Sequence, residues 1–115
     1  MSNTAQPGKL APIKSIHHAA YRCRDAEQTR WFYEDVLGMP LVAAIINEQA
    51  AGRSEEIPYL HLFFGLGDGN TIAFFDEPDG ATAEQFERIG GFDRHVAFLV
   101  DTEEELLAWQ KRIQA

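Results

Sequence analysis

The chain has 115 residues, of which 45% are hydrophobic, and its 18 acidic and 10 basic side chains give a formal net charge of −8. This length and composition predict one globular domain with a modest core and argue against a disordered chain. The negative charge argues against a nucleic-acid surface and against an anionic membrane as a partner.

The sequence carries no pattern typical of export or of a membrane span. No apolar run approaches the roughly 20 residues that cross a bilayer. The opening residues 1–9 are polar, unlike a signal peptide. Cys23 is the only cysteine, so no disulfide can form within the chain. We therefore expect a cytoplasmic protein in which Cys23 is a small apolar residue of a strand.

The first part of the chain predicts a strand followed by a helix. Residues 1–12 show no periodicity and are expected to form a flexible leader. From Ile13 to Cys23 the side chains alternate as in a strand. Asp25 is placed to cap a helix, Gln28 to complete a capping box, and Gly38 to end the helix in the left-handed conformation.

Three more strands follow, which makes the predicted order βαβββ. Short apolar runs predict these strands at Leu41–Ile46, Tyr59–Phe64 and Thr71–Phe75. Between the last two, Gly67–Asn70 predicts a hairpin turn, because glycine and Asx residues tolerate positive φ. Asp76–Gly91 is expected to be a connector with one short helix around residues 83–89.

The pattern then restarts at His95, which is followed by a predicted strand, His95–Val100, and a predicted helix. Counted from His18 and from His95, equivalent residues recur at the same distances. They are the helix caps Asp25 and Thr102, the capping partners Gln28 and Glu105, and the aromatic residues Phe32 and Trp109. We interpret this as an internal duplication offset by 77 residues (95 − 18). The period exceeds that of solenoid repeats and indicates a pair of modules.

The expected fold class is α+β. We divide the chain into a leader (1–12), a first βαβββ module (13–80), a connector (81–93) and the βα start of a second module (94–115). A second module without its last three strands would expose a sheet edge and apolar surface. Pairing between chains, with exchange of a strand or module, is then expected; a fragment without activity is the other interpretation.

Two histidines at equivalent positions suggest a metal site. Internal symmetry would bring His18 and His95 to face each other, and neutral imidazole is the commonest protein ligand for divalent transition metals. Two imidazoles alone bind weakly, so a third ligand, most often a carboxylate, is expected.

The segments around these histidines, His18–Met39 (HAAYRCRDAEQTRWFYEDVLGM) and His95–Val100 (HVAFLV), resemble the vicinal oxygen chelate superfamily. This superfamily includes glyoxalase I, bleomycin-resistance proteins and type I extradiol ring-cleaving dioxygenases. The resemblance implies paired βαβββ modules around one metal held by first-strand and fourth-strand residues. It places His18 and His95 at the first-strand positions and Ala73, which cannot bind a metal, at one fourth-strand position. The remaining ligand, a carboxylate, would lie beyond Ala115.

Two histidines and one carboxylate form the ligand pattern of non-haem Fe(II) oxygenases. The resemblance therefore favours an extradiol dioxygenase acting on a catechol-like substrate, with Fe(II) preferred over Ni, Zn or Mn. His61 is a candidate proton donor or acceptor. Phe63, Phe74 and Phe75 are candidates for an apolar wall against an aromatic small molecule. The alternatives are a glyoxalase-like lyase or isomerase and a metal-free binding protein of the bleomycin-resistance type.

Overall fold

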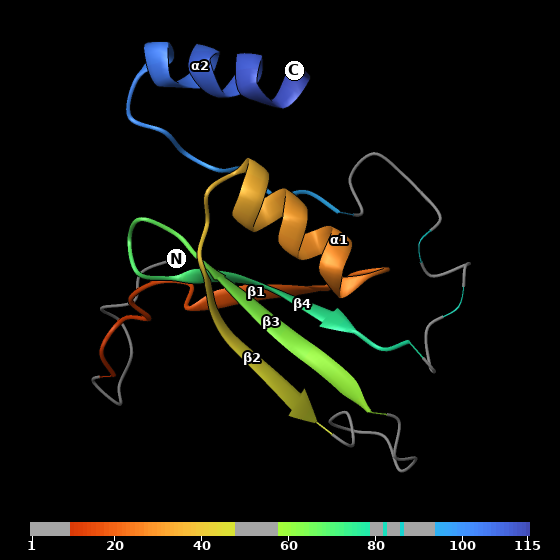
Figure 1. Cartoon of the computed structure of the whole chain (residues 1–115). Helices are drawn as coiled ribbons and strands as arrows, with labels where there is room; N and C mark the ends of the chain where they lie inside the picture. The colour runs from red at the N-terminus through yellow and green to blue at the C-terminus, as the bar shows by residue number, and fades with distance from the viewer. Residues whose placement is uncertain (1–9, 48–57, 79–81, 83–85, 87–93) are drawn as a thin grey trace.

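A computed structural model describes residues 10–47, 58–78, 82, 86 and 94–115. Its strands and helices confirm the predicted βαβββ order and the α+β class (Figure 1). The elements are β1 (His18–Arg22), α1 (Ala26–Arg30), the π-helical turn η2 (Trp31–Val36), β2 (Leu41–Asn47), β3 (Tyr59–Gly65), β4 (Thr71–Asp76) and α2 (Glu103–Gln114).

The four strands form one mixed sheet in the order β1-β4-β3-β2. β4 pairs with β1 in parallel and with β3 in antiparallel fashion, and β2 pairs with β3. β4 occupies an inner position of the sheet, and it reads as a nearly continuous apolar run. Its residues Ile72, Ala73 and Phe74 are all buried. Burial on both faces is what favours such a run over strict alternation.

The core lies on the face of the sheet that α1 and η2 cover (Figure 1). Phe64 is fully buried there, and Leu62 and Phe74 are nearly so. Tyr33 of η2 packs on this layer, with its ring centroid 4.7 Å from that of Phe74 and 5.6 Å from that of Phe64. Aromatic packing thus fixes the helix to one side of the sheet and leaves the other side without a helix in the described part of the chain.

The predicted helix boundaries are confirmed, with one difference in the cap. Asp25 accepts hydrogen bonds from the backbone N–H groups of Glu27 and Gln28. The Gln28 side chain does not complete a capping box, because its Oε1 accepts from Arg24 Nη2 at 2.8 Å. Gly38 ends the helix at φ +73°, a conformation that costs a residue with a Cβ about 1–2 kcal/mol.

The hairpin turn between β3 and β4 also forms as predicted. Gly69 has φ +88°, and Asp68 Oδ1 accepts a hydrogen bond from the Asn70 N–H at 2.9 Å. The turn sets the register in which His61 lies opposite Phe75 and Phe63 opposite Ala73. The same pairing determines which side chains share a face of the sheet.

The second module begins differently from the prediction. Residues 95–100 are extended but belong to no sheet, because no neighbouring strand in the described part of the chain supplies hydrogen-bond partners. α2 does form, and Thr102 caps it by accepting from the Glu105 N–H at 3.1 Å. Arg112 of α2 donates to the backbone oxygens of Asp35 and Val36 at the end of η2.

The C-terminal part exposes much apolar surface. Leu99 is 94% exposed, and α2 contains no buried residue. The radius of gyration is 17.5 Å, against about 13 Å expected for a compact chain of this length. Residues 94–115 therefore add little to the core beneath α1.

Some predictions fall on residues that the structure does not describe. The short helix expected around residues 83–89 and the leader before residue 10 lie outside the described residues. Among the helices that are described, none has both the length and the apolar character needed to cross a membrane.

We expect Phe64→Ala to lower the free energy of unfolding by about 3–5 kcal/mol, because it removes a fully buried ring from the layer beneath η2. Urea denaturation followed by circular dichroism measures the change. As a control, Ile46→Ala, at a residue 74% exposed on β2, should change stability by less than about 0.5 kcal/mol. Equal effects of the two substitutions would contradict the assigned core.

Candidate functional site

The candidate site lies on the sheet face turned away from α1 and η2, called here the open face. Alternation along the strands and the observed register place on it residues from β4 and from its two neighbours, β1 and β3. They are His18 and Arg22 of β1, Thr71, Ala73 and Phe75 of β4, and His61 and Phe63 of β3. Two of the predicted site histidines therefore share one face of the sheet.

His18 is exposed and is surrounded by three rings. Its ring centroid lies 5.2 Å from that of Phe63 and 6.0 Å from that of His61. On another side, His17 Nδ1 lies 2.8 Å from His18 Nδ1, within hydrogen-bond distance. This contact uses Nδ1 of His18 and does not involve its Nε2 atom; which of the two rings donates depends on their tautomers.

His61 is held between two phenylalanine rings. Its ring centroid lies 4.1 Å from that of Phe63 and 4.2 Å from that of Phe75, with which it stacks at 27°. Its Nε2 atom is buried and has no hydrogen-bond partner among the described residues. Burial lowers the pKa of His61 below its ordinary value of 6.5, and the neighbouring His18 lowers it further. The neutral imidazole, which can accept a proton or bind a metal, is thus favoured.

The centre of the open face carries a small residue. Ala73 is fully buried and offers no atom that could bind a metal. Its neighbour on the same face, Thr71, has a buried Oγ1 without a hydrogen-bond partner in the described residues. The fourth-strand position that the resemblance assigns to Ala73 therefore supplies no ligand. The same face carries two buried polar atoms without a partner in the described residues, His61 Nε2 and Thr71 Oγ1.

An ion pair closes one end of the open face. Arg22 Nη1 donates to Glu77 Oε1 at 3.0 Å, and the Glu77 side chain is only 5% exposed. Arg22 lies opposite Phe75 in the register of β1 and β4. The buried carboxylate holds the guanidinium beside the aromatic residues.

The aromatic wall consists of two of the three predicted residues. Phe63 and Phe75 lie on the open face, in contact with His61. Phe74 does not belong to this wall: it is buried in the core against Tyr33. The physical reason is that adjacent residues of a strand point to opposite faces, so Phe74 and Phe75 cannot share one.

His95 is exposed on the extended segment 95–100 and is not among the rings that contact His18. Across the described residues, no three His, Cys, Asp or Glu side chains come close enough to hold one metal ion. His18 and the unpartnered Nε2 of His61 fit a divalent metal in donor chemistry. Two nitrogen donors do not by themselves make a metal site, and no third ligand lies near them among the described residues.

Sequence reasoning missed His17, Thr71 and Glu77. His17 directly precedes β1, so the alternation of side chains along the strand does not extend to it. Thr71 is the first residue of β4 and Glu77 directly follows its last residue; hydrophobic patterns carry little information at such strand ends. Their role depends on β1, which is distant in sequence.

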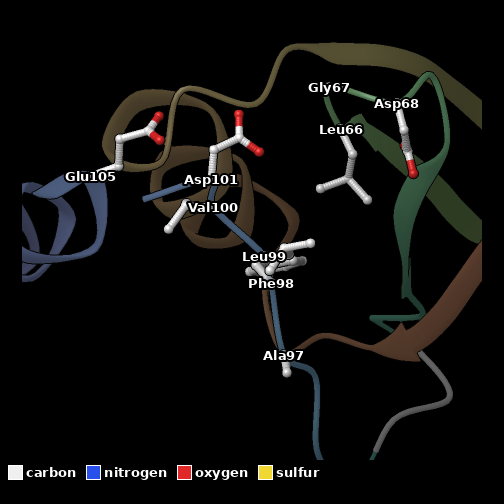
Figure 2. A pocket seen from close by; sticks show the side chains of 9 residues that line it. All are labelled: Leu66, Gly67, Asp68, Ala97, Phe98, Leu99, Val100, Asp101 and Glu105. Atoms are coloured by element: carbon white, nitrogen blue, oxygen red, sulfur yellow. The ribbon is translucent and has the colours of Figure 1, made fainter. Parts of the chain in front are cut away.

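A cavity of about 550 Å³ lies elsewhere, between the β3–β4 turn and the extended segment (Figure 2). It is lined by Leu66, Gly67, Asp68, Ala97, Phe98, Leu99, Val100, Asp101 and Glu105. None of the predicted site residues lines it. Two of its three carboxylates already accept hydrogen bonds, that of Asp68 from Asn70 and that of Glu105 from Thr102. We therefore place the candidate site on the open face.

The sheet order, the helix on one face and the imidazoles on the other define a βαβββ module of the glyoxalase type. The profile of the Glyoxalase/Bleomycin resistance protein/Dioxygenase superfamily matches residues 15–115, and the chain belongs to that superfamily. No curated protein matches the chain significantly.

Solved structures show the same fold. A lactoylglutathione lyase from Agrobacterium tumefaciens matches with a TM-score of 0.54 and 22% identity, over 90% of this chain and 71% of the other. A glyoxalase family protein from Enterococcus faecalis matches with a TM-score of 0.53 and 21% identity, over 86% and 72%.

The lowered pKa of His61 predicts a dependence of stability on pH. Near pH 6.5 the unfolded chain binds a proton at residue 61 more readily than the folded chain does. The free energy of unfolding should therefore fall as the pH drops through about 6.5, and this contribution should level off below the folded-state pKa.

Urea denaturation of the wild type and of His61→Phe at several pH values measures this contribution. The difference between the two should grow in favour of the variant as the pH falls. Val42→Ala, at an exposed residue of β2, is the control and should keep the wild-type dependence. Parallel curves for the wild type and His61→Phe would show that burial does not disfavour the charged ring.

Proposed function

We propose that the protein is a metal-dependent enzyme of this superfamily, most similar to an extradiol ring-cleaving dioxygenase that acts on a catechol-like substrate. The main supporting observation is the open face, where His18 lies beside His61 and Phe63 while β4 carries Ala73 at the fourth-strand position. A site without the fourth-strand carboxylate favours two histidines and one carboxylate, the pattern of non-haem Fe(II) oxygenases.

In this proposal His18 and His95 hold the metal, with Fe(II) favoured over Ni, Zn or Mn. The third ligand, a carboxylate, is expected C-terminal to Ala115. When bound, the metal would serve as Lewis acid and as template for two neighbouring oxygens of the substrate. Because His95 does not contact His18 in the single chain, the ligands from the two halves must be brought together by pairing of modules.

The remaining residues of the open face would bind and orient the substrate. Phe63 presents its ring beside His18 and Phe75 presents its ring beside His61, which suits an aromatic substrate and would exclude water around it. His61, whose pKa is lowered by burial, would accept a proton from a substrate hydroxyl and return it later in the reaction. The rings of Phe63 and Phe75 on either side of the imidazole hold it in one orientation.

A glyoxalase-like lyase or isomerase that uses Ni or Zn is the second candidate. The observation that favours it is the fold shared with a protein named as a lactoylglutathione lyase. A metal-free binding protein of the bleomycin-resistance type is the alternative outside the enzymes. In that case the aromatic residues alone would hold the ligand, and the histidines would be dispensable.

We further propose that two chains pair in the cytoplasm. Val96, Phe98 and Leu99 expose apolar side chains on a segment whose backbone belongs to no sheet. An extended apolar segment of this kind is stabilised when it joins the edge of another sheet. A homodimer with strand or module exchange would cover the segment and bring His95 of one chain toward His18 of its partner.

We expect His18→Ala and His95→Ala each to weaken divalent-metal binding by more than about 100-fold, because each removes a ligand. Loss of a residue that only hydrogen-bonds to a ligand costs about 10–100-fold. Calorimetric titration with Co²⁺, together with metal analysis of the purified protein, measures the effect. Lys14→Ala, at an exposed residue before β1, is the control. Unchanged binding in both histidine variants would refute the metal site.

The two enzymatic candidates differ in their use of oxygen. We expect protein reconstituted with Fe(II) to consume O₂ in the presence of catechols and to be inactive on hemithioacetals, since only ring cleavage incorporates oxygen. An oxygen electrode and the yellow ring-cleavage product give the measurement, with His18→Ala as the inactive control. Turnover of hemithioacetals without oxygen uptake would instead support the lyase.

A further inference from the structure

The contact between His17 and His18 restricts the protonation of the candidate ligand. Their Nδ1 atoms are 2.8 Å apart and their rings meet edge to face, with centroids 5.1 Å apart. Consecutive residues inside a strand point to opposite faces and do not meet in this way. The contact exists because His17 precedes β1, while its backbone oxygen, accepting from the Thr71 N–H at 3.0 Å, ties it to β4.

A hydrogen bond between two Nδ1 atoms requires that one of them carries the proton and the other does not. If His18 donates, its neutral ring has the lone pair on Nε2, the form that binds a metal through that atom. If His17 donates, His18 carries its proton on Nε2 and cannot bind a metal there. The direction of this hydrogen bond therefore decides whether His18 can bind a metal through Nε2.

We propose that His17 is a positioning residue that accepts a hydrogen bond from His18 Nδ1–H and so keeps the Nε2 lone pair of His18 free for the metal. This inference rests on the proposed function, in which His18 is a ligand. Metal-binding histidines characteristically donate their other ring N–H to an acceptor that fixes tautomer and orientation. Here the acceptor is the preceding residue.

The surroundings of His18 support this role. Phe63 and His61 border the ring on the open face, but neither contact is a hydrogen bond. Across the described residues, His17 supplies the one side-chain hydrogen bond to His18. Without it, the exposed ring would be free to turn and to exchange tautomers.

The experiment compares His17→Ala with His17→Asn in the full chain, because asparagine can restore an acceptor near the position of Nδ1. Calorimetric titration with Co²⁺ measures metal affinity, and circular dichroism confirms that each variant is folded. Ser15→Ala, another exposed residue before β1, is the matched control. Independently, ¹⁵N NMR of the metal-free protein identifies which ring nitrogen of His18 carries the proton.

We expect His17→Ala to weaken Co²⁺ binding by about 10–100-fold and His17→Asn to restore most of the affinity. Ser15→Ala should have no effect, and His18 in the wild type should carry its proton on Nδ1. A His18 protonated on Nε2, or unchanged affinity in His17→Ala, would overturn the inference. Loss of binding as complete as in His18→Ala, without rescue by asparagine, would also overturn it, since His17 would then itself be a ligand.

The failure of the proposed function gives a different result. If His18→Ala binds Co²⁺ as tightly as the wild type, the metal site at His18 is refuted together with the role of His17. If His18→Ala loses binding while His17→Ala keeps it, only the positioning role fails.

Discussion

The parallel pairing of β1 with β4 is the constraint on which the rest of the structure depends. It places the first strand beside the last strand of the sheet, so that β4 has a neighbour on both sides. Every side chain of β4 is then either beneath the helix or on the open face. The pairing thus separates the aromatic core around Phe64 and Phe74 from the histidines of the open face.

The small side chain of Ala73 follows from the same arrangement. Ala73 lies between Ala20 of β1 and Phe63 of β3 in the register, at the centre of the open face. Because Ala73 has no side-chain atom beyond Cβ, it leaves space above β4 for the larger rings of the flanking strands. The ring centroids of His18 and His61 are 6.0 Å apart. A long side chain at residue 73 would compete for this space. The position that lacks a ligand is therefore also the position that lets imidazoles from two strands meet.

The features predicted correctly from sequence are those that local chemistry decides. Asp25 and Thr102 cap helices, and Gly38 and Gly69 adopt positive φ, because each conformation depends on one residue and its near neighbours. The strand expected at 95–100 did not form, since a strand needs hydrogen-bond partners from elsewhere and apolar alternation alone does not supply them. The capping box predicted for Gln28 is absent because its side chain instead accepts a hydrogen bond from Arg24.

The candidate site was predictable in its residue types but not in its arrangement. The duplication drew attention to His18, and the apolar strands to Phe63 and Phe75. That His61 stacks on Phe75 depends on register, and that His17 reaches His18 depends on where β1 begins. A shift of one residue in the strand register or in the start of β1 would move a ring to the opposite face of the sheet. Strand boundaries and register are the least certain part of a sequence-based prediction.

The proposed metal and the proposed pairing are thermodynamically coupled. If His18 and His95 bind one ion from two halves, the free energy of metal binding also contributes to association of the halves. The exposed apolar segment 96–99 contributes the remaining, metal-independent part. Since His95 lies away from His18 in a single chain, only the paired form would bind the metal with both ligands. The apparent metal affinity would then be that of the paired form multiplied by the fraction of protein that is paired. In this proposal metal affinity therefore depends on protein concentration, since pairing is what brings His95 to His18.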